Sequence, residues 1–116
     1  MEPYSIGDKK NIGKNMIQFQ LTQSHKLIIE NNDHRIRLII MENEKELVCR
    51  KESICKLEQC ILLTETSIFK GRLQLFKQGN RIDILMKNTH IGSIQALDLQ
   101  NGLSILHAEK MAGLTK

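Results

Sequence analysis

Aromatic residues are scarce in this sequence. Its 116 residues include no tryptophan, one tyrosine (Tyr4) and three phenylalanines (Phe19, Phe69 and Phe76). Proteins that bind single-stranded nucleic acid usually stack the bases on aromatic side chains, and sites for sugars or flavin rings use similar surfaces. The sequence therefore offers little material for a binding site built on stacking.

Long apolar runs are also absent. No stretch approaches the roughly 18 consecutive apolar residues that a membrane-spanning helix needs. The first residues, Met1–Tyr4, lack the basic-then-apolar pattern of a secretory signal. We therefore expect a cytoplasmic protein that does not insert into a membrane.

The three cysteines, Cys49, Cys55 and Cys60, are an odd number, whereas exported disulfide frameworks usually use an even one. Five and four residues separate them, which does not give the tight chelating pair of a zinc knuckle. The four histidines are scattered through the sequence: His25, His34, His90 and His107. We therefore predict reduced thiols, no metal and no cofactor.

No catalytic motif is evident. There is no Gly-x-Ser-x-Gly elbow for a serine nucleophile and no glycine-rich loop that could hold a phosphate. Asp83 and Asp98 are the nearest approach to a carboxylate pair, but each stands among solvent-facing residues of a predicted strand. A cysteine nucleophile would need a histidine brought to it by folding, and no local pattern indicates one. We predict that the protein is not an enzyme.

Branched aliphatic residues dominate what is present. Isoleucine and leucine supply most of the 41% hydrophobic content, which suits half-buried strands. Residues 1–14 carry two glycines and three lysines and are predicted to be a flexible leader. Residues 15–116 are predicted to form a single β-rich domain.

Alternating runs predict the strands. Residues 16–21, 27–29 and 35–41 are extended, and the polar turn at 31–33 makes the last two a hairpin. A second turn at 42–45 precedes a short strand at 46–50. Residues 51–63 fit either a helix, because Ile54, Leu57 and Ile61 have helical spacing, or a strand around 60–63; we favour a short helix followed by an extended segment.

The last third predicts further strands at 73–75, 82–86, 94–99 and 103–106, separated by turns at 77–80, 88–90 and 100–102. Short strands at roughly ten-residue spacing predict a mainly β fold: a small antiparallel meander, a barrel-like sheet or an intertwined sheet, with one short helix.

Basic residues recur in or beside these strands, and the formal net charge is +4. A sheet surface with this charge can contact a phosphate backbone or a protein partner. The simpler interpretation is that these charges only keep the protein soluble and protect the sheet edges from pairing. The residues of this candidate partner or nucleic-acid surface are Arg35, Arg37, Lys70, Arg72, Phe76, Lys77, Arg81 and Lys87.

Residues 57–107 also carry a family resemblance. The segments Gly71–Leu75, Ile82–Met86, Gly92–Asp98 and Asn101–Ile105 follow in the order of the surface presentation of antigens (SPOA) domain. The sequence departs from that pattern at Arg72, Asn88–Thr89 and Ser93. The resemblance implies a closing strand at Asn101–Ile105, strand-exchanged dimers, and a role in the cytoplasmic ring of a type III secretion system or flagellar switch, without catalytic residues.

The predicted function is therefore a non-catalytic protein–protein interaction or scaffolding domain that forms a homodimer. Two alternatives stay open: a small basic nucleic-acid-binding β-domain, and a regulator of phage or plasmid type whose fold alone would not name its target.

Overall fold

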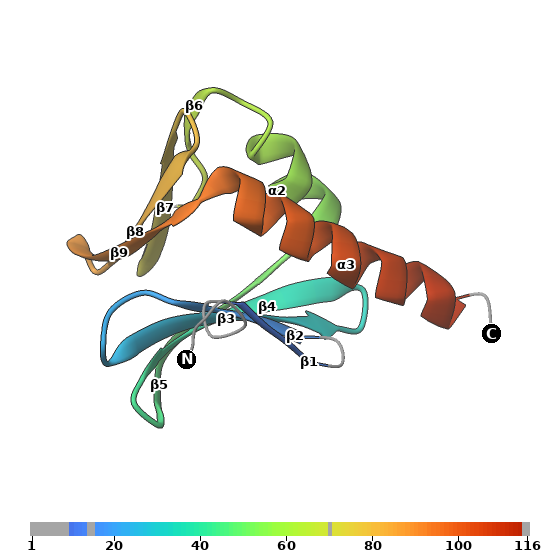
Figure 1. Cartoon of the computed structure of the whole chain (residues 1–116), viewed down its shortest axis with the longest axis horizontal. Helices are drawn as coiled ribbons and strands as arrows, with labels where there is room; N and C mark the ends of the chain where they lie inside the picture. Colours follow the sequence, from blue (N-terminus) through green and yellow to red (C-terminus); the bar gives the residue numbers. More distant parts are fainter. Residues whose placement is uncertain (1–9, 14–15, 70, 115–116) are drawn as a thin grey trace, which may run out of the picture.

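The structure is a computed structural model that describes residues 10–13, 16–69 and 71–114. Within those ranges the chain forms two antiparallel meanders (Figure 1). The first sheet contains, in chain order, β1 (Lys10–Gly13), β2 (Met16–Gln20), β3 (His25–Asn32), β4 (Arg35–Glu42) and β5 (Lys45–Glu52). After α2 (Ile54–Cys60), the second sheet contains β6 (Glu65–Ser67), β7 (Leu73–Gln78), β8 (Arg81–Met86) and β9 (Thr89–Gln95), and α3 (Ala96–Leu114) follows. The prediction of a mainly β, antiparallel fold is confirmed.

Two-residue turns set the register of the hairpins. Asp33 and Asn43 begin the turns after β3 and β4 with φ of 56° each, and Lys87 and Asn88 both have positive φ between β8 and β9. Asp and Asn tolerate this left-handed backbone better than other residues with side chains. The predicted turns at 31–33, 42–45, 77–80 and 88–90 are therefore confirmed to within a residue or two.

Alternation along the strands places one face of each sheet in a shared core. Ile36, Leu38 and Ile40 of β4 are fully buried, as their spacing predicted. Leu75 of β7 and Ile84 of β8 are buried in the same core from the second sheet. Burying a large aliphatic side chain contributes about 1.5–3 kcal/mol, so this core is the main stabilising feature.

The two sheets approach each other closely at one edge. A Cβ atom built on Gly92 of β9 would lie 2.7 Å from the Leu21 Cβ, just after β2. Gly92 also has a φ of +153°, which residues with side chains rarely adopt. Glycine is therefore required here for both conformation and space.

The predicted short helix at 51–63 is confirmed as α2. Ser53 caps it, because its side-chain oxygen accepts a hydrogen bond from the Lys56 backbone N–H. Ile54, Leu57 and Ile61 are buried, as expected from their helical spacing. The extended segment expected at 60–63 is wrong: Cys60 ends α2, residues 61–64 form a turn and a bend, and the next strand, β6, begins at Glu65.

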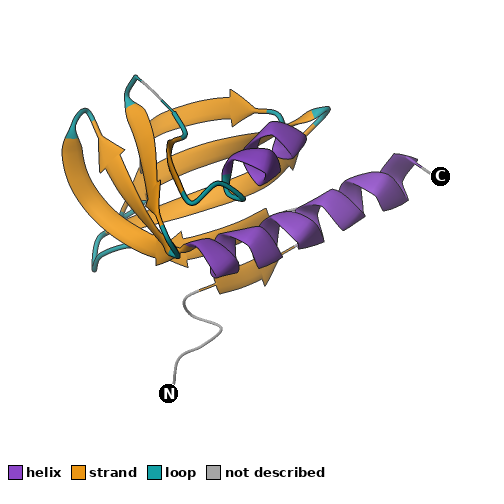
Figure 2. Cartoon of the chain, turned by 90° about the horizontal axis from the view of Figure 1, so that it is seen from above, coloured by secondary structure: helices purple, strands orange, loops and turns teal. Residues whose placement is uncertain are grey.

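Of the strands predicted at 94–99 and 103–106, only residues 94 and 95 are in a strand. Residues 96–99, the predicted turn at 100–102 and residues 103–106 all belong to α3, which lies across the first sheet and beside α2 (Figures 1 and 2). Ala96, Leu99, Leu103 and Leu106 are buried along one side of this helix. Gly102 faces β2: a Cβ atom there would overlap the Ile17 Cδ1. The glycine that suggested a turn is instead a close-packing residue inside a helix.

Two further predictions need correction. The fold contains a long second helix in addition to the one short helix expected, and Asn101–Ile105, which the SPOA resemblance requires as a closing strand, is helical. Residues 10–13 of the predicted leader pair with β2 as strand β1, and the rest of residues 1–14 lies outside the described residues. No helix in the described part of the chain combines the length and apolar character needed to cross a membrane.

Candidate functional site

The predicted basic surface is divided between the two sheets. Arg35 and Arg37 belong to β4 in the first sheet, and the Arg37 guanidinium lies 2.7 Å from a Glu30 carboxylate oxygen. Arg72 and Lys87 lie at one end of the second sheet, where the Lys87 N–H donates to the Arg72 carbonyl. Arg81 begins β8. Lys70 lies outside the described residues.

The Lys77 side chain is buried. It shares the buried face of β7 with Leu73 and Leu75 and is only 7% exposed. Its Nζ donates a 2.6 Å hydrogen bond to the Leu63 carbonyl. The prediction of a partner-binding role for Lys77 is wrong, because this ammonium group holds the loop after α2 against β7.

Phe76 and Phe69 differ in accessibility. Phe76 is 37% exposed, because it is out of phase with buried Leu73 and Leu75 in β7. Phe69 is buried, and the Arg50 guanidinium lies 4.4 Å from its ring centroid. This cation–π contact uses the ring face that a base would need.

The side of the second sheet that carries Phe76 has charges of both signs. Asp83 lies opposite Phe76 in the ladder, and one of its carboxylate oxygens is 3.3 Å from Arg81 Nε and 3.2 Å from His90 Nε2. The surface is hollowed into a depression of about 650 Å³, which Phe76 and Leu85 line together with Asp83 and His90. An apolar centre beside balanced charges is typical of a protein-binding surface.

Several exposed apolar side chains lie near strand β6. Leu62 is 70% exposed and Leu63 is 53% exposed, and both lie in the turn before β6, from which Thr64 separates them. Ser67 of β6 pairs with Phe76, and the Gly79 N–H donates to the Thr64 carbonyl. We define Leu62, Leu63, the strand Glu65–Ser67 and Phe76 as the β6 corner.

A larger groove of about 820 Å³ lies where the end of β2 meets the second sheet and α3. Six of its nine lining residues carry amide or charged side chains; the nine are Phe19, Gln20, Gln78, Asn80, Arg81, Ser93, Ile94, Gln95 and Asp98. Asn80 is already engaged there, because its Oδ1 accepts from the Leu97 N–H and caps α3. Gln78 lines both this groove and the depression beside Phe76.

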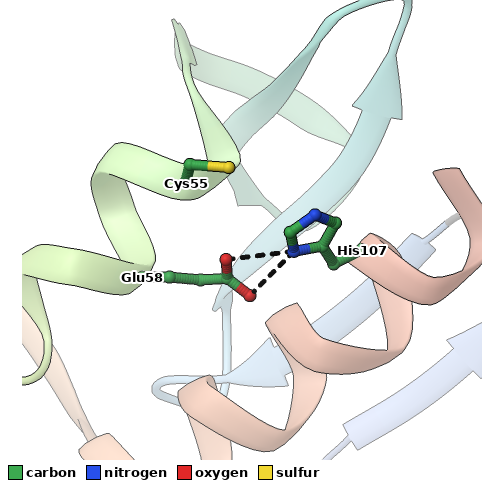
Figure 3. A group of neighbouring side chains, drawn as sticks. All are labelled: Cys55, Glu58 and His107. Atoms are coloured by element: carbon green, nitrogen blue, oxygen red, sulfur yellow. Dashed lines mark hydrogen bonds and ion pairs between the residues drawn. The ribbon is translucent and has the colours of Figure 1, made fainter. Parts of the chain in front are cut away.

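A cluster of side chains that can bind a metal ion lies between α2 and α3. Cys55 and Glu58 of α2 and His107 of α3 place their donor atoms within 4.8 Å of one another. His107 Nδ1 lies 3.1 and 3.3 Å from the two Glu58 carboxylate oxygens (Figure 3). All three cysteines are free; Cys49 and Cys55 are exposed and Cys60 is half-buried. The sequence did not point to this group, because its third member is on the helix that was predicted as strands.

The comparisons with known proteins give no family. No protein-family model, curated protein or solved structure matches this chain.

Proposed function

We propose that this chain is a non-catalytic protein–protein interaction domain that forms a homodimer through the β6 corner. The observation that carries the proposal is the exposure of Leu62, Leu63 and Phe76 around a strand at the edge of a sheet. Single exposed apolar residues are ordinary, but a group of them beside an open edge indicates a binding surface.

The position of β6 at the edge of the second sheet favours a second copy of the chain as the partner. β6 stands at one end of the sheet order β6-β7-β8-β9, so within the described residues only one of its sides is paired with a strand. Two-fold symmetry pairs a short antiparallel strand with itself. If Thr66 lies at the axis, Glu65 of one copy faces Ser67 of the other, and the two carboxylates do not meet.

The charges near Phe76 support the same arrangement. Arg81, Asp83 and His90 supply both signs within one small surface. An isologous contact places a surface against its own copy, so a surface that carries both signs can complement itself. A surface of one sign would repel its copy.

Catalysis is no part of this proposal, and neither is the ring assembly that the SPOA resemblance implies. The strand exchange expected of that family needs a closing strand at Asn101–Ile105, and these residues are helical. The β6 corner offers a different route to a dimer.

Sedimentation velocity at micromolar concentration tests the proposal. The chain should sediment as a species of about twice the 13.4 kDa chain mass. The double variant Leu62→Ser/Leu63→Ser should weaken the dimer at least tenfold, since each buried leucine side chain contributes about 1.5–3 kcal/mol. Leu97→Ser is the matched control, because Leu97 is 54% exposed on α3 outside the corner, and it should dimerise normally. A monomeric wild type, or equal weakening by both variants, would contradict the proposal.

The nucleic-acid alternative has its own test. Fluorescence anisotropy with a labelled single strand and a labelled duplex, at about 50 and 200 mM salt, should detect only weak binding that disappears at the higher salt. Tight binding at about 200 mM salt that is lost in Arg72→Ala/Arg81→Ala would favour that alternative.

A further inference from the structure

Although the sequence alone predicted no metal, we infer that Cys55, Glu58 and His107 form a binding site for one zinc ion that links α2 to α3. A thiolate, a carboxylate and an imidazole are the three side-chain types that zinc prefers. This site lies outside the β6 corner, so the inference does not depend on dimer formation.

The three side chains lie on the sides of α2 and α3 that face each other. Cys55 and Glu58 are three residues apart, so they project from the same side of α2. Buried Ile54 and Leu57 fix the orientation of that helix against the core. Figure 3 shows the Cys55 and Glu58 side chains leaving α2 toward His107.

His107 is held in position from α3. It follows buried Leu106, whose carbonyl accepts a 3.2 Å hydrogen bond from the Asn31 Nδ2. Both helices are thus anchored to the core beside the site. Binding an ion would therefore not carry the entropic cost of ordering the backbone.

The distances fit a tetrahedral ion after a small closure. Zinc lies about 2.0–2.3 Å from nitrogen, oxygen and sulfur ligands, so the donors around it stand about 3.4–3.6 Å apart. His107 Nδ1 already lies 3.1 and 3.3 Å from the Glu58 oxygens. The donor atoms of the group lie no more than 4.8 Å apart, so closing the site needs a movement of about 1 Å. Cys55 is exposed, and its side chain can rotate freely enough to supply that movement.

A metal ion explains this group better than a nucleophilic cysteine does. A thiol–imidazole pair that attacks a substrate needs a cavity in which the substrate can sit. The two largest hollows described above are lined by other residues. Three protein ligands around a half-exposed position leave the fourth zinc ligand to water.

The test uses the full chain, reduced and without an affinity tag. After equilibration with zinc and dialysis, atomic emission should find one zinc per chain. Zinc at a free concentration of 100 times its Kd should raise Tm by about 10 °C, because the ion binds only the folded state. Cobalt in place of zinc should give a thiolate-to-cobalt absorption band.

The variants assign the ligands. Cys55→Ser should remove the cobalt–thiolate band, and both Cys55→Ser and His107→Ala should reduce zinc affinity at least 100-fold. Glu58→Gln should weaken binding less, because an amide oxygen can still coordinate. Cys49→Ser, which changes an exposed thiol on β5, is the matched control and should bind zinc like the wild type. Less than stoichiometric zinc in the folded wild type would overturn the inference, and so would full binding by Cys55→Ser or loss of binding in Cys49→Ser.

Discussion

Gly102 offers the sharpest test of how α3 packs on the first sheet. In the middle of a helix, replacing glycine by alanine normally stabilises the helix by about 1 kcal/mol. Here the new Cβ atom would overlap the Cδ1 of Ile17, a fully buried residue on β2. Forcing an extra carbon into a close-packed core costs about 1–3 kcal/mol, so we expect Gly102→Ala to destabilise the protein by about 1 kcal/mol.

The effect should change sign when Ile17 is shortened. Ile17→Val removes the Cδ1 atom and by itself costs about 1 kcal/mol. The other contacts of the added Cβ, at 3.6 Å to Phe19 Cζ and 3.7 Å to Ile17 Cγ1, are ordinary van der Waals distances. In the Ile17→Val background, Gly102→Ala should therefore stabilise by about 1 kcal/mol, which is a coupling of about 2 kcal/mol between the two sites.

Urea unfolding followed by circular dichroism on the wild type, the two single variants and the double variant measures this coupling. Equal destabilisation by Gly102→Ala in both backgrounds would refute the packing of α3 against Ile17. It would indicate instead that the glycine is needed for its backbone conformation, as in the turn expected from the sequence.

Three further predictions concern neighbouring features. Asn101→Ala should raise stability by about 0.5 kcal/mol in thermal unfolding, because Asn101 is exposed on a helix, whereas in a turn the change would lower it. Asn80→Ala should lower stability by about 1 kcal/mol by removing the cap on the Leu97 N–H, and Asn80→Asp should retain most of the wild-type urea midpoint. Gly92→Ala should cost about 2 kcal/mol because its Cβ would meet Leu21, and an unchanged melting temperature would contradict that close approach.

Local pattern predicted the strands well. β3, β4, β7 and β8 alternate buried and exposed residues, and turn residues such as Asn43 and Asn88 mark their ends. In these segments the periodicity and the turn chemistry favour the same structure. The short helix α2 was predictable for the same reason, since its apolar spacing and the Ser53 cap agree.

α3 was missed because two local signals favoured a different structure. Asn101–Gly102 is a strong turn signal, and apolar Ile94 and Ala96 on either side of Gln95 resemble a strand pattern across the end of β9 and the start of α3. The spacing of Ala96, Leu99, Leu103 and Leu106 is helical and could have identified it. The decisive contact, between Gly102 and Ile17, joins residues far apart in the sequence.

The candidate sites were predictable only in part. The alternation of β7 places Phe76 outward and Lys77 on the buried face with Leu73 and Leu75. It does not position the loop whose Leu63 carbonyl accepts the hydrogen bond from Lys77 Nζ. The approach of His107 to Glu58 depends on how two helices pack, which no local pattern describes.

The most direct test of self-association through β6 is amide hydrogen exchange at two protein concentrations, one below and one above the dimer Kd. The edge amides of Glu65–Ser67 should exchange more slowly at the higher concentration, because dimer formation pairs them, while the amides of β5, an edge strand of the first sheet, should exchange at the same rate at both concentrations. Slower exchange confined to β5, or rates in β6 that do not depend on concentration, would contradict the proposal.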